Sequence, residues 1–454
     1  MTRIAPARTA AYEVMRAVST GAADLPHALA RARSNLTDER DRALAGEIAT
    51  GTLRWRSAFD RIASEIGRRP ANRFDPEVLD ILRITMFQLL HLDRVPASAA
   101  VSDAVSLTRR AGKSSAATIV NAILRRVSRE RDRLPLPPRP TDPSDREAAL
   151  DYLSITLSHP RWLASRWLDR YGYESTEAWL RFNNTPPRLT LRANRLRTTA
   201  GDLADALARH GVRVRPGRYG ADALVVEEGN PLSTPLANEG LFFVQDEASQ
   251  IVAQMVDARP GDRVLDACAS PGGKTTAIAA AMGDRGLIVA TDVRGKRVDL
   301  LARTVRASGA GSVRIVRADV TAPLPFAATF DWILLDAPCS GLGTIRRDPD
   351  LRWSRTEADF ADFAARQQAM LMETAAVLSP GGRVIYSTCS SEPEENEAVV
   401  RAAVESGTLR LERPSHLPAV LQPLINEAGH LRTMPFSHGL EAFFGAVLVK
   451  SSGR

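Results

Sequence analysis

The chain contains three cysteines, and each lies in a short segment with other side chains that could take part in chemistry. Cys268 follows Asp266 by two residues, Cys339 follows Asp336 by three, and Cys389 stands in a Ser-Thr-Cys-Ser run. A lone cysteine is most often a small buried apolar residue. A thiolate, however, is a strong nucleophile and a good leaving group, which suits covalent catalysis. We therefore expect one reaction centre, and because three scattered thiols form no disulfide framework, we expect a reducing, cytoplasmic setting.

The segments around these cysteines are predicted strands and the turns that follow them. After residue 242, apolar runs alternate with helical segments, which is typical of an α/β fold with a doubly wound parallel sheet. The predicted strands span residues 263–267, 287–292, 313–319, 332–336 and 383–387. The first four end in Asp266, Asp292, Asp319 and Asp336. Because ligands bind outside the carboxyl ends of such strands, we expect these acids to accept hydrogen bonds from ribose hydroxyls or an amino group.

The turn after the first strand, residues 268–276, differs from two phosphate-binding loops. A P-loop requires glycine where this chain has Cys268, five residues before Gly273. The dinucleotide fingerprint also fails, because only Gly272 and Gly273 are present and Pro271 stands where a free amide is needed. We interpret the turn as one that lets the backbone approach a ligand without phosphate. S-adenosylmethionine fits, with its adenosine, cationic sulfur and amino-acid tail.

Positive charge is concentrated at the front of the chain. Residues 1–133 hold 23 basic and 15 acidic side chains, whereas the whole chain holds 60 and 53. Many of the front arginines lie within residues 54–73, 109–113 and 125–133. Such clusters suit a nucleic-acid backbone, since each neutralised phosphate releases counterions. We favour RNA binding over the alternative, a solvated helical surface in a chain that has only four lysines.

The chain divides into four predicted segments. Helical periodicity predicts an all-α bundle over residues 1–133, and five prolines in its continuation predict a stiff linker over 134–150. Strand patterns around one helix predict a small α+β module over 151–240, ahead of the α/β domain over 241–454. No apolar stretch is long enough for a transmembrane helix, and the first residues lack the apolar core of a signal peptide.

Three motifs in the second half resemble those of the Fmu/Sun/Nop2 family of RNA cytosine-5 methyltransferases. They lie at residues 264–276, 331–353 and 381–396, and they include Asp-Ala-Pro-Cys-Ser around Cys339 and Thr-Cys-Ser around Cys389. Residues 96–101 and 120–126 resemble the helical domain related to the antitermination factor NusB. The resemblance implies a NusB-like RNA-binding bundle, a small α+β RNA-binding module and a Rossmann-like class I methyltransferase domain. It points to the bacterial members that act on 16S ribosomal RNA.

By this resemblance, a methyl group moves from S-adenosyl-L-methionine to carbon 5 of a cytosine. Carbon 5 is a weak nucleophile, so a thiolate must first add at carbon 6, and an acid stabilises the charge that develops at ring nitrogen 3. The family assigns the attack to Cys389, product release to Cys339, contact with the base to Asp336, and orientation to Lys274. Spacing alone leaves the attacking thiol open, since DNA cytosine-5 methyltransferases use the cysteine of a Pro-Cys pair. A helix predicted to begin at Pro393 would favour a Cys389 thiolate, although the glutamates in its first turn oppose that effect.

The cofactor-binding residues implied by the resemblance come from the first turn and the strand ends. They are Ala267, Cys268, Ala269, Ser270, Pro271, Gly272, Gly273, Lys274, Asp292, Arg297, Asp319 and Asp336. The Cys268 thiol itself is expected only to pack, and Arg346 and Arg347 are candidates for contact with the phosphates of a flipped-out nucleotide. The expected partner is ribosomal RNA or an early small-subunit particle, bound by a monomer without a metal and without membrane contact.

Two other functions stay open on these grounds. The same chemistry could act on a transfer RNA or another ribosomal site, or the chain could be a non-catalytic RNA-binding factor for ribosome assembly. Family members commonly carry an Asp-Gly-Phe-Phe segment near the end, where this chain has Glu441-Ala442-Phe443-Phe444. The presence of both Cys339 and Cys389 favours the enzyme.

Overall fold

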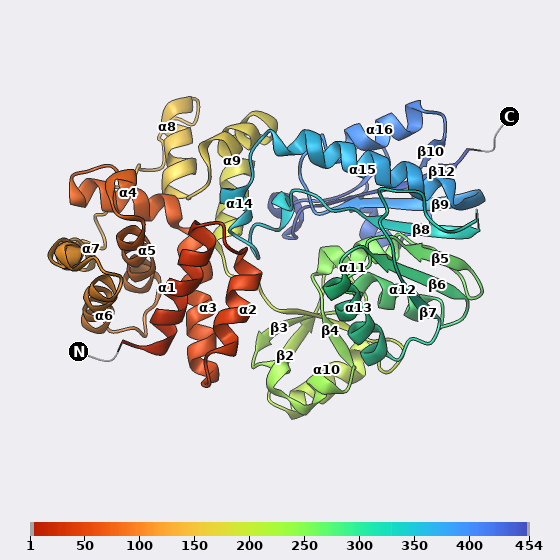
Figure 1. Ribbon diagram of the computed structural model, residues 1–454. Coiled ribbons are helices and arrows are strands. Elements are labelled where there is room, and N and C mark those ends of the chain that lie inside the picture. The colour runs from red at the N-terminus through yellow and green to blue at the C-terminus, as the bar shows by residue number, and fades with distance from the viewer. Residues whose placement is uncertain (1–3, 328, 452–454) are drawn as a thin grey trace. The chain divides into compact units, whose positions relative to one another are not determined.

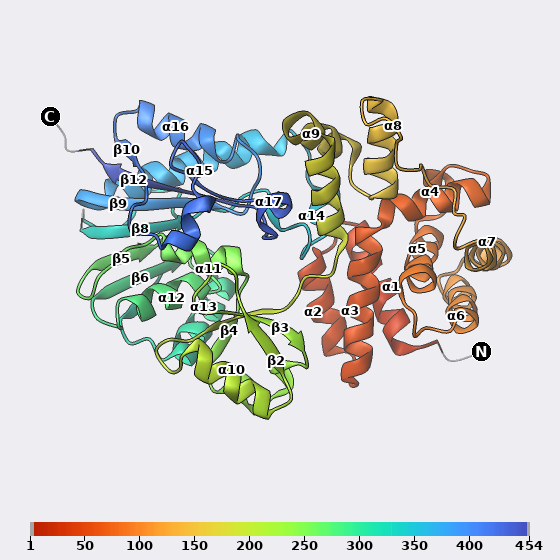
Figure 2. The same cartoon turned by 180° about the vertical axis from the view of Figure 1, so that it is seen from behind.

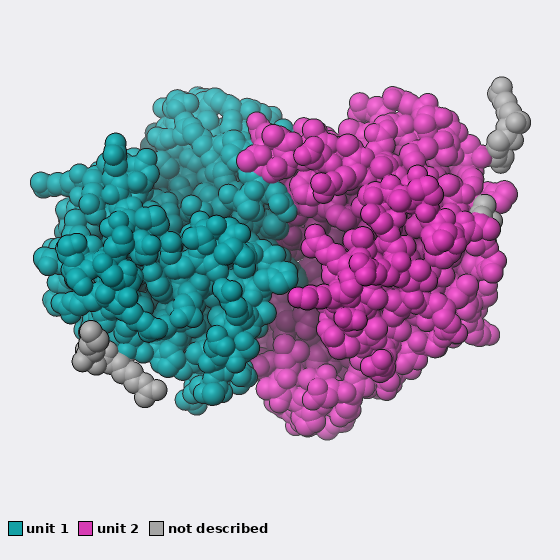
Figure 3. Space-filling model, viewed as in Figure 1, with its two compact units in different colours: residues 1–186, 345–355 teal, residues 187–344, 356–454 magenta. Residues whose placement is uncertain are grey.

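The computed structural model describes residues 4–327 and 329–451. Two compact units make up the chain (Figure 3): Met1–Pro186 with Ile345–Arg355, and Pro187–Thr344 with Thr356–Arg454. The predicted segment boundaries at 133, 150 and 240 concern smaller parts of these units and stay predictions. Among the helices of the described residues, none combines the length and the hydrophobicity needed to cross a membrane.

The first unit begins with the predicted helical bundle. Its helices are α1 (Pro6–Ser19), α2 (Leu25–Ser34), α3 (Glu39–Arg54), α4 (Arg56–Gly67), α5 (Pro76–His91), α6 (Ala97–Arg110) and α7 (Ala117–Arg129) (Figure 1). The central helix is α5, whose residues 78–88 are all buried among the other helices because its apolar side chains cover the whole circumference. Asp38 caps α3 by accepting a hydrogen bond from the backbone N–H of Arg40.

The first unit also contains a segment from much later in the chain. After α8 (Arg146–Asp151) and α9 (Arg161–Asn184), the unit is completed by residues 345–355, which form α14 (Leu351–Ser354). The fully buried Arg352 guanidinium donates to the Ser158 carbonyl at 3.0 Å and to Asn184 Oδ1 at 2.9 Å. Trp353 Nε1 donates to the Leu53 carbonyl at 2.8 Å. Residues 345–355 therefore belong to the core of this unit, although only five residues separate them from Cys339.

The second unit begins with the predicted small α+β module. Its antiparallel sheet has the order β2-β3-β1-β4, with β1 (Thr190–Ala193), β2 (Arg213–Pro216), β3 (Ala223–Glu228) and β4 (Phe242–Val244). Helix α10 (Ala200–Arg209) packs on it through Leu203 and Leu207, which are both fully buried. The helix and the strands β1 and β3 match the prediction, whereas β2 and β4 were not predicted.

The main sheet contains all five predicted strands, which are parallel to one another: β5 (Arg263–Asp266), β6 (Leu287–Asp292), β7 (Val313–Arg317), β8 (Phe330–Asp336) and β9 (Leu378–Thr388). The prediction of a parallel sheet is wrong at one edge. There β12 (Phe443–Lys450) runs antiparallel to β9, and β10 (Leu409–Glu412) and β11 (Leu431–Thr433) pair with β12. The order is β10-β12-β9-β8-β5-β6-β7.

Helices cover both faces of this sheet (Figures 1 and 2). Successive residues of β8 alternate between the faces, because side chains of a strand point to opposite sides. Ile333 and Leu335 face α15 (Asp359–Ala376) and α16 (Glu397–Glu405), while Trp332 and Leu334 face α11 (Glu247–Gln254), α12 (Gly273–Ala281) and α13 (Gly295–Ser308). The carboxyl ends of the parallel strands thus meet at one edge between two helical layers.

Candidate active site

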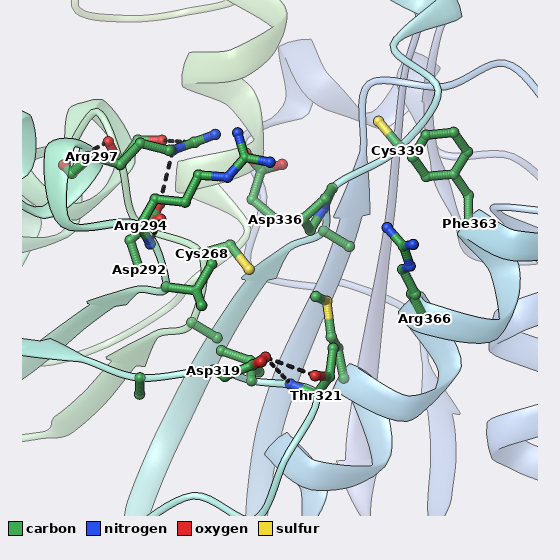
Figure 4. Close-up of a pocket in the computed structure, with 18 of the residues that line it drawn as sticks. Cys268, Asp292, Arg294, Arg297, Asp319, Thr321, Asp336, Cys339, Phe363 and Arg366 are labelled. Carbon is green, nitrogen blue, oxygen red and sulfur yellow. Dashed lines mark hydrogen bonds and ion pairs between the residues drawn. The ribbon is translucent and has the colours of Figure 1, made fainter. Parts of the chain in front are cut away.

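A cavity of about 520 Å³ lies at this edge of the second unit (Figure 4). Nine of the predicted residues line it: Ala267, Cys268, Ser270, Asp292, Arg297, Asp319, Asp336, Cys339 and Cys389. In Figure 4, Asp292 and Cys339 lie on either side of Asp336. The cavity therefore brings three of the four strand-end acids and the two cysteines of the motifs into one site.

The two motif cysteines are in contact. Cys339 Sγ and Cys389 Sγ are 3.2 Å apart, although the two residues lie 50 positions apart in the sequence. The hydrogen bond to Cys389 and burial together raise the pKa of the Cys339 thiol well above its ordinary value. The contact and the burial therefore both favour the protonated form of the Cys339 thiol.

Asp336 lies at the end of β8 with a fixed orientation. Lys274 Nζ is 2.7 Å from Asp336 Oδ2, and Ser387 Oγ donates to Asp336 Oδ1 at 2.8 Å. Burial alone would lower the pKa of Lys274, but the Asp336 carboxylate outweighs burial and raises it. Lys274 is absent from the residues described as lining the cavity, so it acts on the site through Asp336.

The other strand-end acids differ in their surroundings. Asp292 Oδ2 is 3.0 Å from Arg297 Nε, and Arg297 also donates to the Ser270 carbonyl, which ties the first turn to α13. Asp319 accepts from the backbone and the hydroxyl of Thr321, and these hydrogen bonds lower its pKa. Asp266 is fully enclosed beneath the site, accepts from Thr275 Oγ1 at 2.6 Å, and has its pKa raised by burial to about 7.

The glycine turn also serves packing, and its approach to the ligand stays a prediction. Gly272 has φ +103°, and a Cβ there would lie 2.9 Å from Leu301 Cδ1 and 3.2 Å from Thr304 on α13. Like Lys274, four other turn residues that were predicted to contact the cofactor are absent from the described lining: Ala269, Pro271, Gly272 and Gly273. The Cys268 side chain does line the cavity, and burial raises the pKa of its thiol.

Helix α15 supplies lining residues that the motifs did not indicate. Phe363, Arg366 and Met370 lie on one helical face and line the cavity, and Figure 4 labels the first two of them. In the sequence, only their spacing of three and four residues indicated that the three side chains share one face of a helix. Arg294 and Val320, which follow two of the strand-end acids, were also missed.

One further expectation is wrong. The helix after Cys389 begins at Glu397 rather than Pro393, because Glu395 and Asn396 turn inward to bond the cysteine loops. Arg346 donates to the carbonyls of Thr185 and Pro186 at 3.2 and 2.9 Å and stacks on Phe182 within the first unit. These contacts orient the guanidinium, and contact of Arg346 and Arg347 with phosphates stays a prediction.

Comparison with known proteins identifies similar chains. A family model described as 16S rRNA methyltransferase RsmB/F matches residues 253–449, the NusB family matches 5–129, and a ferredoxin-like domain of RsmF/B-like methyltransferases matches 159–233. The chain is 34% identical to "Ribosomal RNA small subunit methyltransferase B" of Pseudomonas putida over 98% of both chains. It is 32% identical to "Probable ribosomal RNA small subunit methyltransferase B" of Bacillus subtilis over 91% of both. The crystal structure of PH0851 superposes with a TM-score of 0.79 at 25% identity, over 99% of both chains. The predicted resemblance and the fold class are confirmed.

Proposed function

The chain belongs to the RsmB/F family of 16S rRNA methyltransferases, and on that premise we propose that it methylates carbon 5 of a cytosine in 16S ribosomal RNA. The methyl donor in this proposal is S-adenosyl-L-methionine. The observation that carries the proposal is the contact between the Cys339 and Cys389 sulfurs beside Asp336 in one cavity.

The residues that line the cavity fit the donor molecule. Asp292 and Asp319 can accept hydrogen bonds from hydroxyl and amino groups, and Val293, Val320 and Met370 offer apolar contacts for an adenine ring. Asp336 contributes a carboxylate toward a cationic group. When bound, S-adenosyl-L-methionine supplies the methyl group on a sulfonium.

The two thiols divide the work in this mechanism. The Cys389 thiolate adds to carbon 6 of cytosine, which makes carbon 5 enamine-like and able to accept the methyl group. As the thiolate adds, ring nitrogen 3 takes up a proton. The Asp336 carboxylate, oriented by Lys274 and Ser387, accepts a hydrogen bond from that N–H and so stabilises the protonated ring. Carbon 5 then loses its proton and the bond between Cys389 and carbon 6 breaks, with Cys339 assisting this release. The assignment of attack to Cys389 follows the resemblance of its Thr-Cys-Ser segment to the motif of the family.

The first unit supplies a surface that suits the RNA. A groove of about 820 Å³ between α6 and α7 is lined by Arg109, Arg125 and Arg129 together with serines, Thr118 and Asn121. Its described lining includes no Asp or Glu. Arginines and hydroxyls are the groups that contact phosphates and riboses, so this groove supports RNA binding by the front bundle. The proposed working form is a cytoplasmic monomer.

Radiolabelled S-adenosyl-L-methionine tests the chemistry. The wild type, Cys389→Ala and Cys339→Ala are each incubated with unmodified 16S ribosomal RNA and, separately, with transfer RNA. We expect label in 16S RNA from the wild type only, and a denaturant-stable protein–RNA adduct that accumulates with Cys339→Ala and is absent with Cys389→Ala. Exchanged phenotypes would reverse the roles of the thiols. Label in transfer RNA, or RNA binding without label, would replace the proposal with one of the two alternatives.

Salt dependence tests the groove. Replacing Arg109 and Arg125 by alanine should weaken RNA binding and reduce the slope of log affinity against log salt by about 1 to 2. The matched control replaces the exposed Arg31 and Arg33 of α2. Equal slopes for the two double variants would remove the groove from the RNA-binding surface.

A further inference from the structure

A buried carboxylate joins the two cysteine loops. Glu395 is 0% exposed, and its Oε1 accepts from the Ser340 backbone N–H at 2.7 Å and from Gln367 Nε2 at 3.1 Å. Its Oε2 accepts from Ser340 Oγ at 2.6 Å and Ser390 Oγ at 2.5 Å. All four groups donate, so the ionised carboxylate satisfies each of them without an O–H of its own.

The partners of Glu395 are the residues next to the two thiols. Ser340 directly follows Cys339, and Ser390 directly follows Cys389. The two hydroxyls are also 3.2 Å from each other. One carboxylate therefore fixes the chain immediately after both sulfurs, from two loops that are far apart in the sequence.

The turn that carries Glu395 is itself held in place. Tyr386 Oη donates to the Glu395 carbonyl at 2.5 Å. Asn396 accepts from Thr388 Oγ1 at 2.5 Å and donates to the Ser390 carbonyl at 2.9 Å. These bonds explain why α16 begins at Glu397 rather than at Pro393. The backbone of residues 393–396 is not helical and directs the Glu395 and Asn396 side chains toward the two cysteine loops.

We propose that Glu395 is a positioning residue that holds the Cys339 and Cys389 loops in the register that brings their sulfurs into contact. The inference deepens the proposed function and rests on it for its catalytic meaning. Without the carboxylate, the buried Ser340 N–H and both hydroxyls lose their acceptor, and burial of unpaired polar groups favours separation of the loops. Among the groups that raise the pKa of Cys339, after Cys389 and burial, is the negative charge of Glu395.

The proximity of the two sulfurs can be measured without RNA or cofactor. The test uses the full-length chain carrying Cys268→Ser and oxidised dithiothreitol as the oxidant. Cys339 and Cys389 form a disulfide and give up two electrons and two protons, which reduce the oxidised dithiothreitol to its dithiol form. The equilibrium fraction of disulfide, read by alkylation and mass spectrometry, gives the effective concentration of one thiol at the other. This equilibrium reports proximity in the folded protein, and a thermal melt of each variant confirms folding.

Four variants decide the inference. Glu395→Ala should lower the effective concentration at least tenfold. The double variant Ser340→Ala and Ser390→Ala should lower it as well. Glu395→Gln should have a smaller effect, because the amide oxygen still accepts from the Ser340 N–H and the hydroxyls can rotate to accept from the amide. Glu405→Ala, at the exposed end of α16, is the control and should leave it unchanged.

A methyl-transfer assay of the same variants then tests whether the proximity of the two sulfurs affects catalysis. We expect kcat to fall in the same order as the effective concentration, with the KM for S-adenosyl-L-methionine unchanged. An effective concentration in Glu395→Ala equal to that of the control would overturn the inference. If that variant does not fold, an effective concentration in the double serine variant equal to that of the control would overturn it instead. If Glu395→Ala lowers the effective concentration while the wild type labels no RNA, the positioning role stands and the proposed function fails.

Discussion

Replacing Lys274 by methionine tests the ion pair that orients Asp336. The two groups are 2.7 Å apart, and their side chains are 14% and 27% exposed. Methionine keeps most of the aliphatic length but removes the ammonium donor, while the hydrogen bond from Ser387 to the carboxylate is kept. The change therefore removes a charge from the edge of the site with little loss of volume.

The distance sets the size of the effect. Two unit charges 2.7 Å apart attract by about 6 kcal/mol at an effective dielectric constant of about 20, which is an upper bound. Residual exposure screens the pair, and the lysine no longer has to be desolvated, so the net loss should be about 2 kcal/mol in the free energy of unfolding. Misorientation of Asp336 should lower methyl transfer at least tenfold.

Urea unfolding and the labelling assay measure both effects, with Lys296→Met as the matched control, since Lys296 is exposed on α13. We expect the control to stay within about 0.5 kcal/mol of the wild type, as surface substitutions usually do. If Lys274→Met also stays within that range and keeps full activity, the pair neither stabilises the fold nor orients the acid, and the reasoning is refuted.

Three further substitutions test other parts of the structure. Burial raises the pKa of Asp266 to about 7 in the folded protein, so the folded state holds a proton on this carboxyl that the unfolded state has released above about pH 4. The wild type should therefore lose stability as the pH rises from about 4 to about 7, whereas Asp266→Asn should not lose this contribution. The difference in melting temperature between the two proteins should shift in favour of the variant over this pH range. Gly272→Ala should destabilise by about 2 kcal/mol more than Gly261→Ala, because both glycines have positive φ but only the first faces α13 closely, and chemical denaturation of the pair measures the difference. Arg352→Met should cost about 3 kcal/mol by leaving buried acceptors such as Asn184 Oδ1 unpaired, seen as earlier melting of the first unit, and an unchanged melt would contradict its structural role.

The sequence by itself determined the local elements and the chemical class. Apolar runs predicted the positions of β5, β6 and β8 to within a few residues, because a buried strand needs a continuous apolar segment whatever its neighbours are. The same pattern predicted the second half of β9, which begins earlier in the sequence, at Leu378. The same pattern predicted that the acids at the strand ends lie close together, since parallel strands place their carboxyl ends at one edge of the sheet. The motifs around Cys339 and Cys389 identified the family, because the chemistry requires those residue types in fixed local order.

Only the tertiary structure decided what depends on contacts between distant segments. The antiparallel β12 beside β9, the insertion of Arg352 into the first unit, and the face of α15 that carries Arg366 depend on pairings that no local pattern specifies. The 3.2 Å contact of the thiols and the carboxylate of Glu395 that joins their loops belong to the same class. Local sequence restricts which side chains can react. Their distances arise from packing of the whole sheet and its helices, in which each segment is placed by the others.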